Sequence, residues 1–329
     1  MVQFFYQETT DSAFNLALEE LLVREVNDEI FFLWQNSPAV IIGRNQNTLA
    51  EINSDFIHDN KVNVTRRNTG GGAVYHDLGN INYSYIVNFK EGCSINFADF
   101  AVPVIKTLAE MGVTADFSGR NDILINGRKI SGSAQSRIGN RILFHGTMLF
   151  DVNIENLVNA LNVSGIKISG KGIASVRSRV TNIKEHLSQN LTVQDFINAV
   201  SNSIRRQFNS KNDYIVPENI LLRAEELANS KYRTWEWNYG NSPEFNYEKS
   251  NKFTGGNVTL HLNIQKGKIM SADFSGDFFS RQEVTVLEKM LENATISAEN
   301  ISEILDSLPI SEMFINITAA EILSLFPLM

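Results

Sequence analysis

The sequence predicts an α+β protein with a large domain of mainly antiparallel or mixed sheets flanked by helices, followed by a small C-terminal α+β accessory domain. We expect the first domain to span residues 1–248 and the second 249–329. Three observations predict this fold: an amphipathic stripe after Asp11, a hairpin signal at Asn126-Gly127, and an apolar alternation from Val258 to Ile264 that follows a long aperiodic stretch. Because short hairpins alternate with isolated helices, we expect no doubly wound sheet.

The first element is a helix that begins after Asp11, a residue type that often caps helices. Its apolar stripe has helical spacing and consists of Phe14, Ala17, Leu18, Leu21 and Leu22. Two apolar strands follow at 30–34 and 39–43, joined by the turn-forming residues QNSP. The segments VNVTR and INYSYIVNF read as further strands on either side of a glycine-rich motif.

The hairpin at Asn126-Gly127 has the residues that a two-residue type I′ turn requires. If the returning strand is regular, Lys129, Ser131 and Ser133 face one side, and Ile130, Gly132 and Ala134 face the other. The same period in ILFHGTMLF predicts one face that comprises Leu143, His145, Thr147 and Leu149.

Two helices are expected next, one capped by Thr192 and one from Pro217 through Leu227. The stretch SKYRTWEWNYGNSPEF and the following EKSNKFTGG lack any period, so we interpret them as a connecting segment. Alternating apolar residues from Val258 then predict a hairpin, and helices complete the chain.

Composition excludes several functional classes. A net charge of −8 disfavours nucleic acid as a partner, because phosphate binding needs clustered basic residues. The N-terminus lacks the features of a signal peptide, and no apolar run approaches the roughly 18 residues of a membrane span, so we expect a cytoplasmic protein. The single cysteine, Cys93, allows no internal disulfide, and the five histidines lack metal-ligand spacing.

The motif RRNTGGGAVYHDLGN, residues 66–80, is the first candidate for ligand chemistry. Three glycines let a ligand approach the backbone, and the N–H groups of such a turn can hold anionic oxygens. Arg66, Arg67 and Thr69 supply further donors. The motif is neither a P-loop nor a dinucleotide fingerprint, and a simple tight turn remains the alternative.

The second candidate is GRNDILINGRKISGSAQ, residues 119–135. Lys129 is either a solvated strand residue or a cation beside small residues that leave room for a ligand. Asp122 is either a residue at the end of the hairpin or an acceptor for a metal ion or ribose hydroxyl.

These two motifs, together with FHGTMLF, resemble the lipoate-protein ligase A family, within a fold group that also holds biotin-protein ligases and lipoyl or octanoyl transferases. DSAFNLALEE, GRNQN, SRVTN and SKYRTWEWNYG look familial as well, so the resemblance covers the whole chain. One departure is Thr69, where the family usually has serine; the hydroxyl is retained.

The resemblance implies an ATP- and Mg²⁺-dependent ligase that activates lipoate to lipoyl-AMP, releases pyrophosphate, and transfers the lipoyl group to a lysine. The implied acceptors are lipoyl domains of 2-oxoacid dehydrogenase E2 subunits and the glycine cleavage H protein. Octanoate is a possible second substrate, and we expect a monomer with no membrane partner. The domain at 1–248 would be catalytic, with Lys129 contacting both the lipoate carboxylate and the α-phosphate.

The resemblance also assigns residues to each part of the site. The ATP or adenylate would lie against Arg67, Thr69, Gly72, Ala73, Val74, Tyr75, Asn80, Asp122 and Lys129. Lipoate would lie against Trp34, Arg67, His76, Lys129, Gly132, Ala134, His145 and Thr147. A lid over the adenylate would include Lys171, Gly172, Arg179, Val180, Thr181 and Asn182. Asp122 is the candidate Mg²⁺ ligand. Trp34, Val74 and Leu143 are either core residues or the wall of a tunnel for the acyl tail.

Two alternatives remain from the residues. A transferase of the same fold would move octanoyl or lipoyl groups between carrier proteins without ATP, and it would need an activated thiol, for which Cys93 is the candidate. A non-catalytic lipoate- or nucleotide-binding protein is the other alternative. The lid segment itself could be a solvated loop, because it has no period that buries a face.

Overall fold

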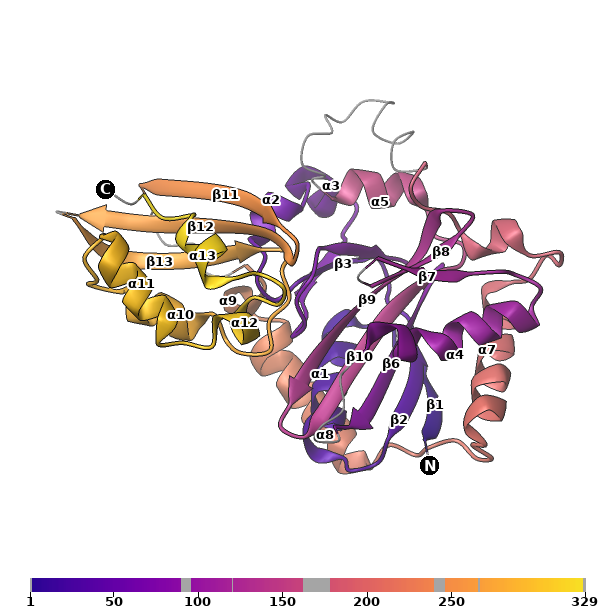
Figure 1. Cartoon of the computed structure of the whole chain (residues 1–329). Coiled ribbons are helices and arrows are strands. Elements are labelled where there is room, and N and C mark those ends of the chain that lie inside the picture. Colours follow the sequence, from indigo (N-terminus) through magenta and orange to yellow (C-terminus); the bar gives the residue numbers. More distant parts are fainter. Residues whose placement is uncertain are drawn as a thin grey trace. The chain divides into compact units, whose positions relative to one another are not determined.

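The structure is a computed structural model that describes residues 2–89, 96–119, 121–161, 178–239, 246–265 and 267–327. The chain divides into two compact units (Figure 1). Unit one comprises 1–41, 52–65 and 74–238, and unit two comprises 42–51, 66–73 and 239–329. Unit two therefore contains the C-terminal part of the chain and two loops from the N-terminal part.

Unit one is built on a mixed seven-stranded sheet (Figure 1). Its strands are, in spatial order, β1 (Gln3–Gln7), β2 (Ile30–Trp34), β6 (Asn80–Asn88), β10 (Arg141–Leu149), β9 (Arg128–Ile138), β8 (Asp122–Ile125) and β7 (Asp116–Ser118). The pair β1–β2 is parallel, and every other pair in the sheet is antiparallel. The prediction of a mainly antiparallel α+β fold is confirmed.

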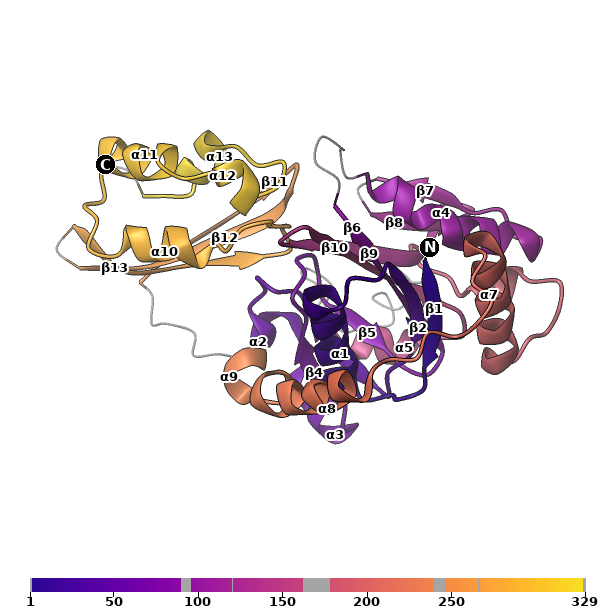
Figure 2. The same ribbon diagram turned by 90° about the horizontal axis from the view of Figure 1, so that it is seen from below.

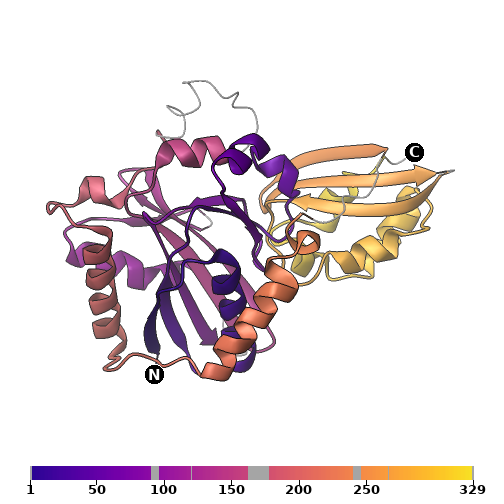
Figure 3. The ribbon, with the colours of Figure 1, turned by 180° about the vertical axis from the view of Figure 1, so that it is seen from behind.

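Helices cover both faces of this sheet. On one face, α4 (Phe97–Glu110) and α7 (Val193–Phe208) bury a core with Phe31, Tyr83 and Phe144. On the other, α1 (Ser12–Glu25) and α8 (Glu218–Leu227) pack against Phe32 and Leu143. The view from behind shows these two helices against the sheet (Figure 3). The caps predicted at Asp11 and Thr192 are both present.

A second sheet of unit one has the order β4 (Asn63–Arg66), β3 (Ala39–Ile42) and β5 (Val74–His76). Its strand ends at Ile42 and Arg66 lead into the two loops that belong to unit two. Short helices also occur. In unit one these are α3 (Ser54–Asp59), α5 (Ile154–Ala160) and the 3₁₀ helix η1 (Ile183–His186), and α2 (Thr48–Glu51) belongs to unit two.

The prediction of a connecting segment from SKYRTWEWN through EKSNKFTGG is wrong at both ends. Most of EKSNKFTGG lies in the strand β11 (Tyr247–Phe253). The first part contributes to the π-helix η2 (Ala228–Tyr232) and forms the short helix α9 (Trp235–Asn238). Buried Glu20 of α1 holds it, accepting hydrogen bonds from Lys231 Nζ at 2.8 Å and Tyr232 Oη at 2.7 Å. Tyr232 also packs into the apolar core around α1, but the segment has no regular apolar stripe that sequence periodicity could detect.

The C-terminal part of unit two is a three-stranded antiparallel sheet with helices on one face (Figure 2). The strands are β11 (Tyr247–Phe253), β12 (Gly256–Gln265) and β13 (Lys268–Gly276). The helices are α10 (Thr285–Leu291), α11 (Ala298–Asp306), α12 (Ile310–Met313) and α13 (Ala319–Leu323). They enclose a core of their own around Leu260, Phe274 and Phe314. The predicted boundary at 248–249 falls inside β11 and, as a functional division, stays a prediction.

Within the described residues, no helix combines the length and the apolar character needed to cross a bilayer.

Candidate functional site

One face of the large sheet carries a row of side chains that runs across five strands. Trp34 on β2 pairs with Asn82 on β6, and Asn82 pairs with Thr147 on β10. Thr147 Oγ1 accepts a hydrogen bond from the N–H of Gly132 on β9 at 3.2 Å, and Gly132 pairs with Asp122 on β8. Directly paired residues point to the same side of a sheet, so we call these five residues the transverse row. The predicted shared face of His145 and Thr147 agrees with this register.

Lys129 reaches the transverse row because of a β-bulge. Leu124 pairs with Lys129, but Ile123 pairs with Ser131, so Ile130 is an extra residue in β9. The prediction that Lys129 and Gly132 face opposite sides is therefore wrong. The ammonium of Lys129 forms an ion pair with Asp122 Oδ1 at 2.7 Å, and a Cβ on Gly132 would lie 2.8 Å from Lys129 Nζ. Gly132 thus provides the space in which the lysine side chain lies.

The transverse row runs from an exposed end to a buried end. The side chains of Lys129 and Asp122 are 36% and 34% exposed, whereas Asn82 and Trp34 are each 2% exposed. A carboxylate could reach the lysine at the exposed end while an apolar tail extends inward.

The end of the predicted lid segment is fixed to the main chain of Lys129. The Lys129 N–H donates to Arg179 O at 2.7 Å, and the Thr181 N–H donates to Lys129 O at 3.0 Å. Thr181 Oγ1 donates to Glu185, and the Asn182 side chain bonds both the N–H and the carbonyl of Val152. Lys171 and Gly172 lie outside the described residues, so the lid stays a prediction.

A second row lies one step along the same strands and contains His145, Ser84 and Ala134. Sequence reasoning missed Glu19 of α1, which is 3% exposed and lies 2.9 Å from His145 Nδ1. Ser84 Oγ donates to Glu19 at 2.6 Å and accepts from the indole N–H of Trp34 at 2.8 Å. The apolar stripe of α1 does not include Glu19, so the sequence pattern gave no signal that this acid is buried; a buried carboxylate needs a partner, and His145 and Ser84 are close enough to serve.

His76 and Asn80 lie in a buried network of amides. Asn36 Nδ2 lies 3.0 Å from His76 Nδ1, and Asn36 Oδ1 accepts from Asn15 Nδ2. Asn80 Nδ2 donates to Asn82 Oδ1 at 2.9 Å. These contacts orient His76 and Asn80, and their roles toward a ligand stay predictions.

The glycine motif of unit two is organised by its two arginines. Arg66 donates to the carbonyls of Gly43, Arg44 and Gln46 at 2.6–3.0 Å and to Thr48 Oγ1 at 2.7 Å. Burial lowers the pKa of Arg66 to about 10, and the charge of Asp273 acts in the opposite direction. The arginine therefore keeps its charge at neutral pH.

Arg67 is also buried, and its guanidinium bonds the glycine turn itself. It donates to Thr69 Oγ1 at 3.0 Å and to the carbonyls of Gly70 and Gly72 at 2.8 Å each. Contact with a nucleotide through Arg67 or Thr69 stays a prediction, whereas shaping of the turn is observed.

The three glycines differ in their surroundings. A Cβ on Gly70 would lie 2.5 Å from the carbonyl oxygen of Phe278, and one on Gly71 would lie 3.0 Å from the ring of Phe279. A Cβ on Gly72 would meet nothing within 4 Å. Packing therefore favours glycine at position 70, packing and a φ of +92° favour it at position 71, and Gly72 alone of the three has open space beside it.

The remaining predicted residues lie near β5 or on the sheet. Val74 and Tyr75 belong to β5, directly after Ala73, and the Tyr75 side chain is 2% exposed. Burial, with a contribution from Asp77, raises the pKa of Tyr75. Its side chain is thus a packing element, and contact of this segment with a nucleotide stays a prediction. Cys93 lies outside the described residues.

No group of three metal-binding side chains occurs within the described ranges. Asp122 offers a single carboxylate, and Mg²⁺ commonly takes one or two carboxylates together with phosphate oxygens and water. The residues present therefore fit Mg²⁺ only if it arrives with a nucleotide.

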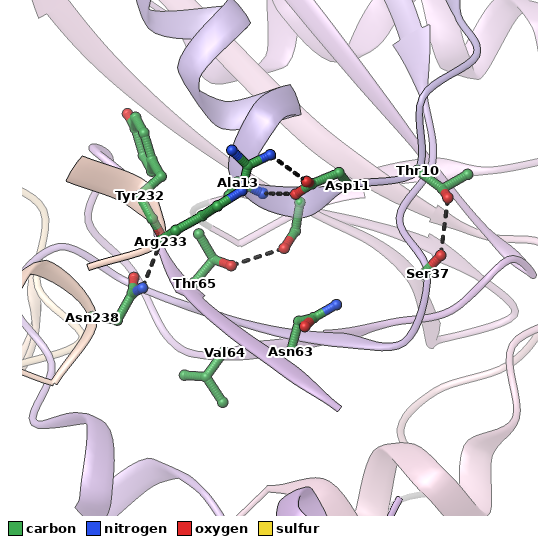
Figure 4. Close-up of a pocket in the computed structure, with 11 residues that line it drawn as sticks. Thr10, Asp11, Ala13, Ser37, Asn63, Val64, Thr65, Tyr232, Arg233 and Asn238 are labelled. Carbon is green, nitrogen blue, oxygen red and sulfur yellow. Dashed lines mark hydrogen bonds and ion pairs between the residues drawn. The ribbon is translucent and has the colours of Figure 1, made fainter. Parts of the chain in front are cut away.

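A separate polar pocket of about 420 Å³ lies near the N-terminus of α1 (Figure 4). Asp11 caps the helix and pairs with Arg233 at 2.6 Å, and Ser12 shares a hydrogen bond with Thr65. Thr10 and Ser37 share another. These groups satisfy one another, and none of the predicted site residues lines this pocket.

Comparison with known proteins gives consistent matches along the chain. Residues 11–205 match the model of the lipoyl protein ligase A/B catalytic domain, and residues 242–326 match that of the bacterial lipoate protein ligase C-terminus. The chain is 41% identical to the lipoate-protein ligase LplJ of Bacillus subtilis, covering 97% of this chain and 98% of that protein. It is 38% identical to lipoate-protein ligase 1 of Staphylococcus aureus, covering 96% and 97%.

Solved structures agree with these matches. The lipoate complex of Plasmodium falciparum LipL1 superimposes with a TM-score of 0.79 at 28% identity, covering 94% of this chain and 95% of that one. A lipoate-protein ligase A bound with ATP gives a TM-score of 0.62 at 25% identity, covering 73% and 98%. A bi-partite lipoate ligase from Thermoplasma acidophilum, described with its E2 lipoyl domain, gives 0.66 at 28% identity, covering 74% and 97%.

Proposed function

The chain belongs to the lipoate-protein ligase family, and from that premise we propose that it joins lipoate to a lysine of an acceptor protein in two steps driven by ATP. In the first step a carboxylate oxygen of lipoate attacks the α-phosphorus of ATP, the bond to pyrophosphate breaks, and lipoyl-AMP forms. In the second step the acceptor amine attacks the acyl carbon, AMP leaves, and the new amide nitrogen loses a proton to solvent.

The observation that carries this proposal is the position of Lys129. Both reactants of the first step are anions, so a fixed cation at their junction lowers the barrier. The β-bulge directs Lys129 Nζ to the exposed end of the transverse row, beside the small residue Gly132. There the ammonium could bind the lipoate carboxylate and an α-phosphate oxygen while the acyl tail follows the row inward.

Asp122 has two roles in this proposal. Without substrate it neutralises Lys129 through the ion pair at 2.7 Å. With nucleotide bound, its carboxylate would hold Mg²⁺, whose charge would stabilise the departing pyrophosphate. The partial exposure of both side chains lets the pair rearrange.

Further parts of the proposal concern partners and location. Acceptors would be lipoyl domains of 2-oxoacid dehydrogenase E2 subunits and the glycine cleavage H protein, supported by the E2 lipoyl domain named with one structural relative. The enzyme would act as a monomer in the cytoplasm, with residues 1–248 as the catalytic domain and 249–329 as the accessory domain.

Incubation of the protein with ATP, Mg²⁺ and lipoate tests the first step through release of pyrophosphate. Addition of a lipoyl domain tests the second through its mass increase by one lipoyl group. Both signals should disappear when ATP is omitted. Lipoyl transfer that needs a carrier-bound acyl donor and ignores ATP would instead establish the carrier-to-carrier transferase, and substitution of Cys93 would then abolish it.

A further inference from the structure

The side-chain amide of Asn82 is the feature of the transverse row that its neighbours do not satisfy. Asn82 is 2% exposed, and its Oδ1 accepts from Asn80 Nδ2 at 2.9 Å. Its Nδ2 has no hydrogen-bond partner among the described residues. A buried donor without an acceptor costs about 1–3 kcal/mol, so its presence requires an explanation.

Most of the surrounding polar groups are engaged with one another, and the exception beside Asn82 is Asn80 Oδ1, an acceptor that also has no partner among the described residues. The Trp34 N–H donates to Ser84, and Ser84 donates to Glu19, which also contacts His145. Thr147 Oγ1 accepts from the Gly132 N–H. These contacts leave the Asn82 N–H as a donor that a ligand on this face would meet.

The distance from Lys129 to Asn82 matches the length of lipoate. Gly132, over which the Lys129 ammonium lies, is two strands away from Asn82, which corresponds to about 10 Å. With carbon–carbon bonds of about 1.5 Å, the sulfur-bearing carbons of an extended lipoate lie roughly 6 and 9 Å from its carboxyl carbon. A lipoate whose carboxylate binds Lys129 therefore brings its dithiolane ring to Asn82 and Trp34.

We infer that Asn82 determines specificity for the sulfur-containing end of the substrate, its Nδ2–H donating a hydrogen bond to a dithiolane sulfur. Sulfur is a weak acceptor and also packs favourably against aromatic rings, here that of Trp34. A methylene in the same place accepts no hydrogen bond and leaves the amide unsatisfied. The site would therefore discriminate against carbon analogues of lipoate. This inference rests on the proposed function.

The test compares lipoate with 5-cyclopentylpentanoate, in which carbon replaces both sulfurs and the ring shape is kept. The readout is kcat/KM for pyrophosphate release with ATP and Mg²⁺, and octanoate serves as the flexible analogue. The wild-type protein should prefer lipoate over the carbon isostere by roughly three- to tenfold, the effect of one hydrogen bond. The variant Asn82→Leu, apolar and of similar size, should reduce this preference to about one.

Asn82→Ala repeats the measurement in a variant that cannot overpack the site. Asn238→Ala is the matched control, because it removes another buried amide, 4% exposed, that donates to Tyr232 O outside this face. It should leave the preference unchanged. If an active Asn82 variant still prefers lipoate over the carbon isostere as the wild type does, the inference about Asn82 is wrong and the proposed function stands. The same holds if the variant loses kcat/KM equally with all three acids. A wild-type protein that releases no pyrophosphate with any of them overturns the proposed function as well.

Discussion

Lys129 in unit one and the Arg66-Arg67 pair in unit two look alike in sequence, since each is a cation beside small residues. In the structure they differ. The Lys129 ammonium is partly exposed and faces a carboxylate, whereas both arginines are buried and donate to backbone carbonyls. A guanidinium has five donors in a fixed plane and can satisfy several carbonyls of a tight loop, which an ammonium does less well. A cation near glycines can thus serve either the fold or a ligand, and the groups around it are needed to distinguish the two roles.

Lys129→Ala gives the strongest test of this difference. It should lower the rate of pyrophosphate release by about 100- to 1000-fold, because one preorganised charge donor is lost. Thermal unfolding should stay at the wild-type temperature, since the side chain is partly exposed. Lys184→Ala is the matched control: this lysine pairs with Asp151 at 2.6 Å and has similar exposure, but lies outside the transverse row. Equal activity in both variants would remove Lys129 from the mechanism.

Arg66→Ala should produce the opposite pattern, a loss of stability. Three loop carbonyls would lose a charged donor, so we expect the free energy of unfolding to fall by on the order of 3 kcal/mol. Denaturant unfolding measures this change. Arg44→Ala is the control in the same unit, because its ion pair with Glu283 is exposed and worth about 1 kcal/mol or less. If both variants unfold at the same denaturant concentration, Arg66 does not hold the loop.

Gly70 and Gly72 allow the same comparison, of a residue that serves the fold with one that serves a ligand, within a single turn. Gly70→Ala should destabilise by on the order of 2 kcal/mol, because its methyl group would press on the Phe278 carbonyl. Gly72→Ala has open space and should leave stability within about 0.5 kcal/mol. It should instead lower kcat/KM for ATP, because the methyl group would stand where the ligand approaches. Similar destabilisation by both substitutions would contradict the assignment of Gly72 to the ligand.

The two units also bury acids in different surroundings. The variant that tests this difference has the smallest expected effect on stability. Glu19 contacts His145 and Ser84, whereas Glu288 accepts from the Phe274 N–H beside the negatively charged Asp273. Burial raises the pKa of Glu288 from 4.5 to about 7, with a contribution from Asp273. The fold thus favours the protonated carboxyl group of Glu288. Its contribution to the free energy of unfolding is fully present below pH 4.5 and is lost as pH rises through about 7.

Glu288→Gln keeps the acceptor for Phe274 and removes the titration. The variant should be more stable than the wild type above pH 7, by on the order of 2 kcal/mol or less, and nearly equal to it below pH 4.5. Unfolding measured between pH 4 and 8 checks this. If the free energies of unfolding of the variant and the wild type differ by the same amount from pH 4 to pH 8, Glu288 does not titrate in that range.

Much of the fold could be predicted because its signals are local. The cap at Asp11, the Asn126-Gly127 turn with both residues at positive φ, and the alternation in β10 each depend on neighbouring residues. The segment from Ser230 to Asn238 was misread because its contacts are with α1, where Glu20 lies more than 200 positions away in the sequence. Long-range polar contacts leave no periodic trace.

The site was predictable in composition and less so in geometry. Lys129 and Gly132 were recognised as candidates, but the bulge at Ile130 that brings them to one face depends on the register of β8. Glu19 and Asn82 went unnoticed, because a polar residue on a buried face acquires meaning only once its hydrogen-bond partners are known. Arg66 could not be distinguished from a ligand-binding residue without the carbonyls around it.

The two main-chain hydrogen bonds that Lys129 forms with Arg179 and Thr181 have a consequence for how this enzyme can evolve. Main-chain atoms of Arg179 and Thr181 make both contacts, so mutation of the side chains at 179 and 180 leaves them intact. Genetic drift can alter the chemistry of this segment without displacing the lysine beside it. Proline at 181 is the exception, because it deletes the N–H that bonds the Lys129 carbonyl.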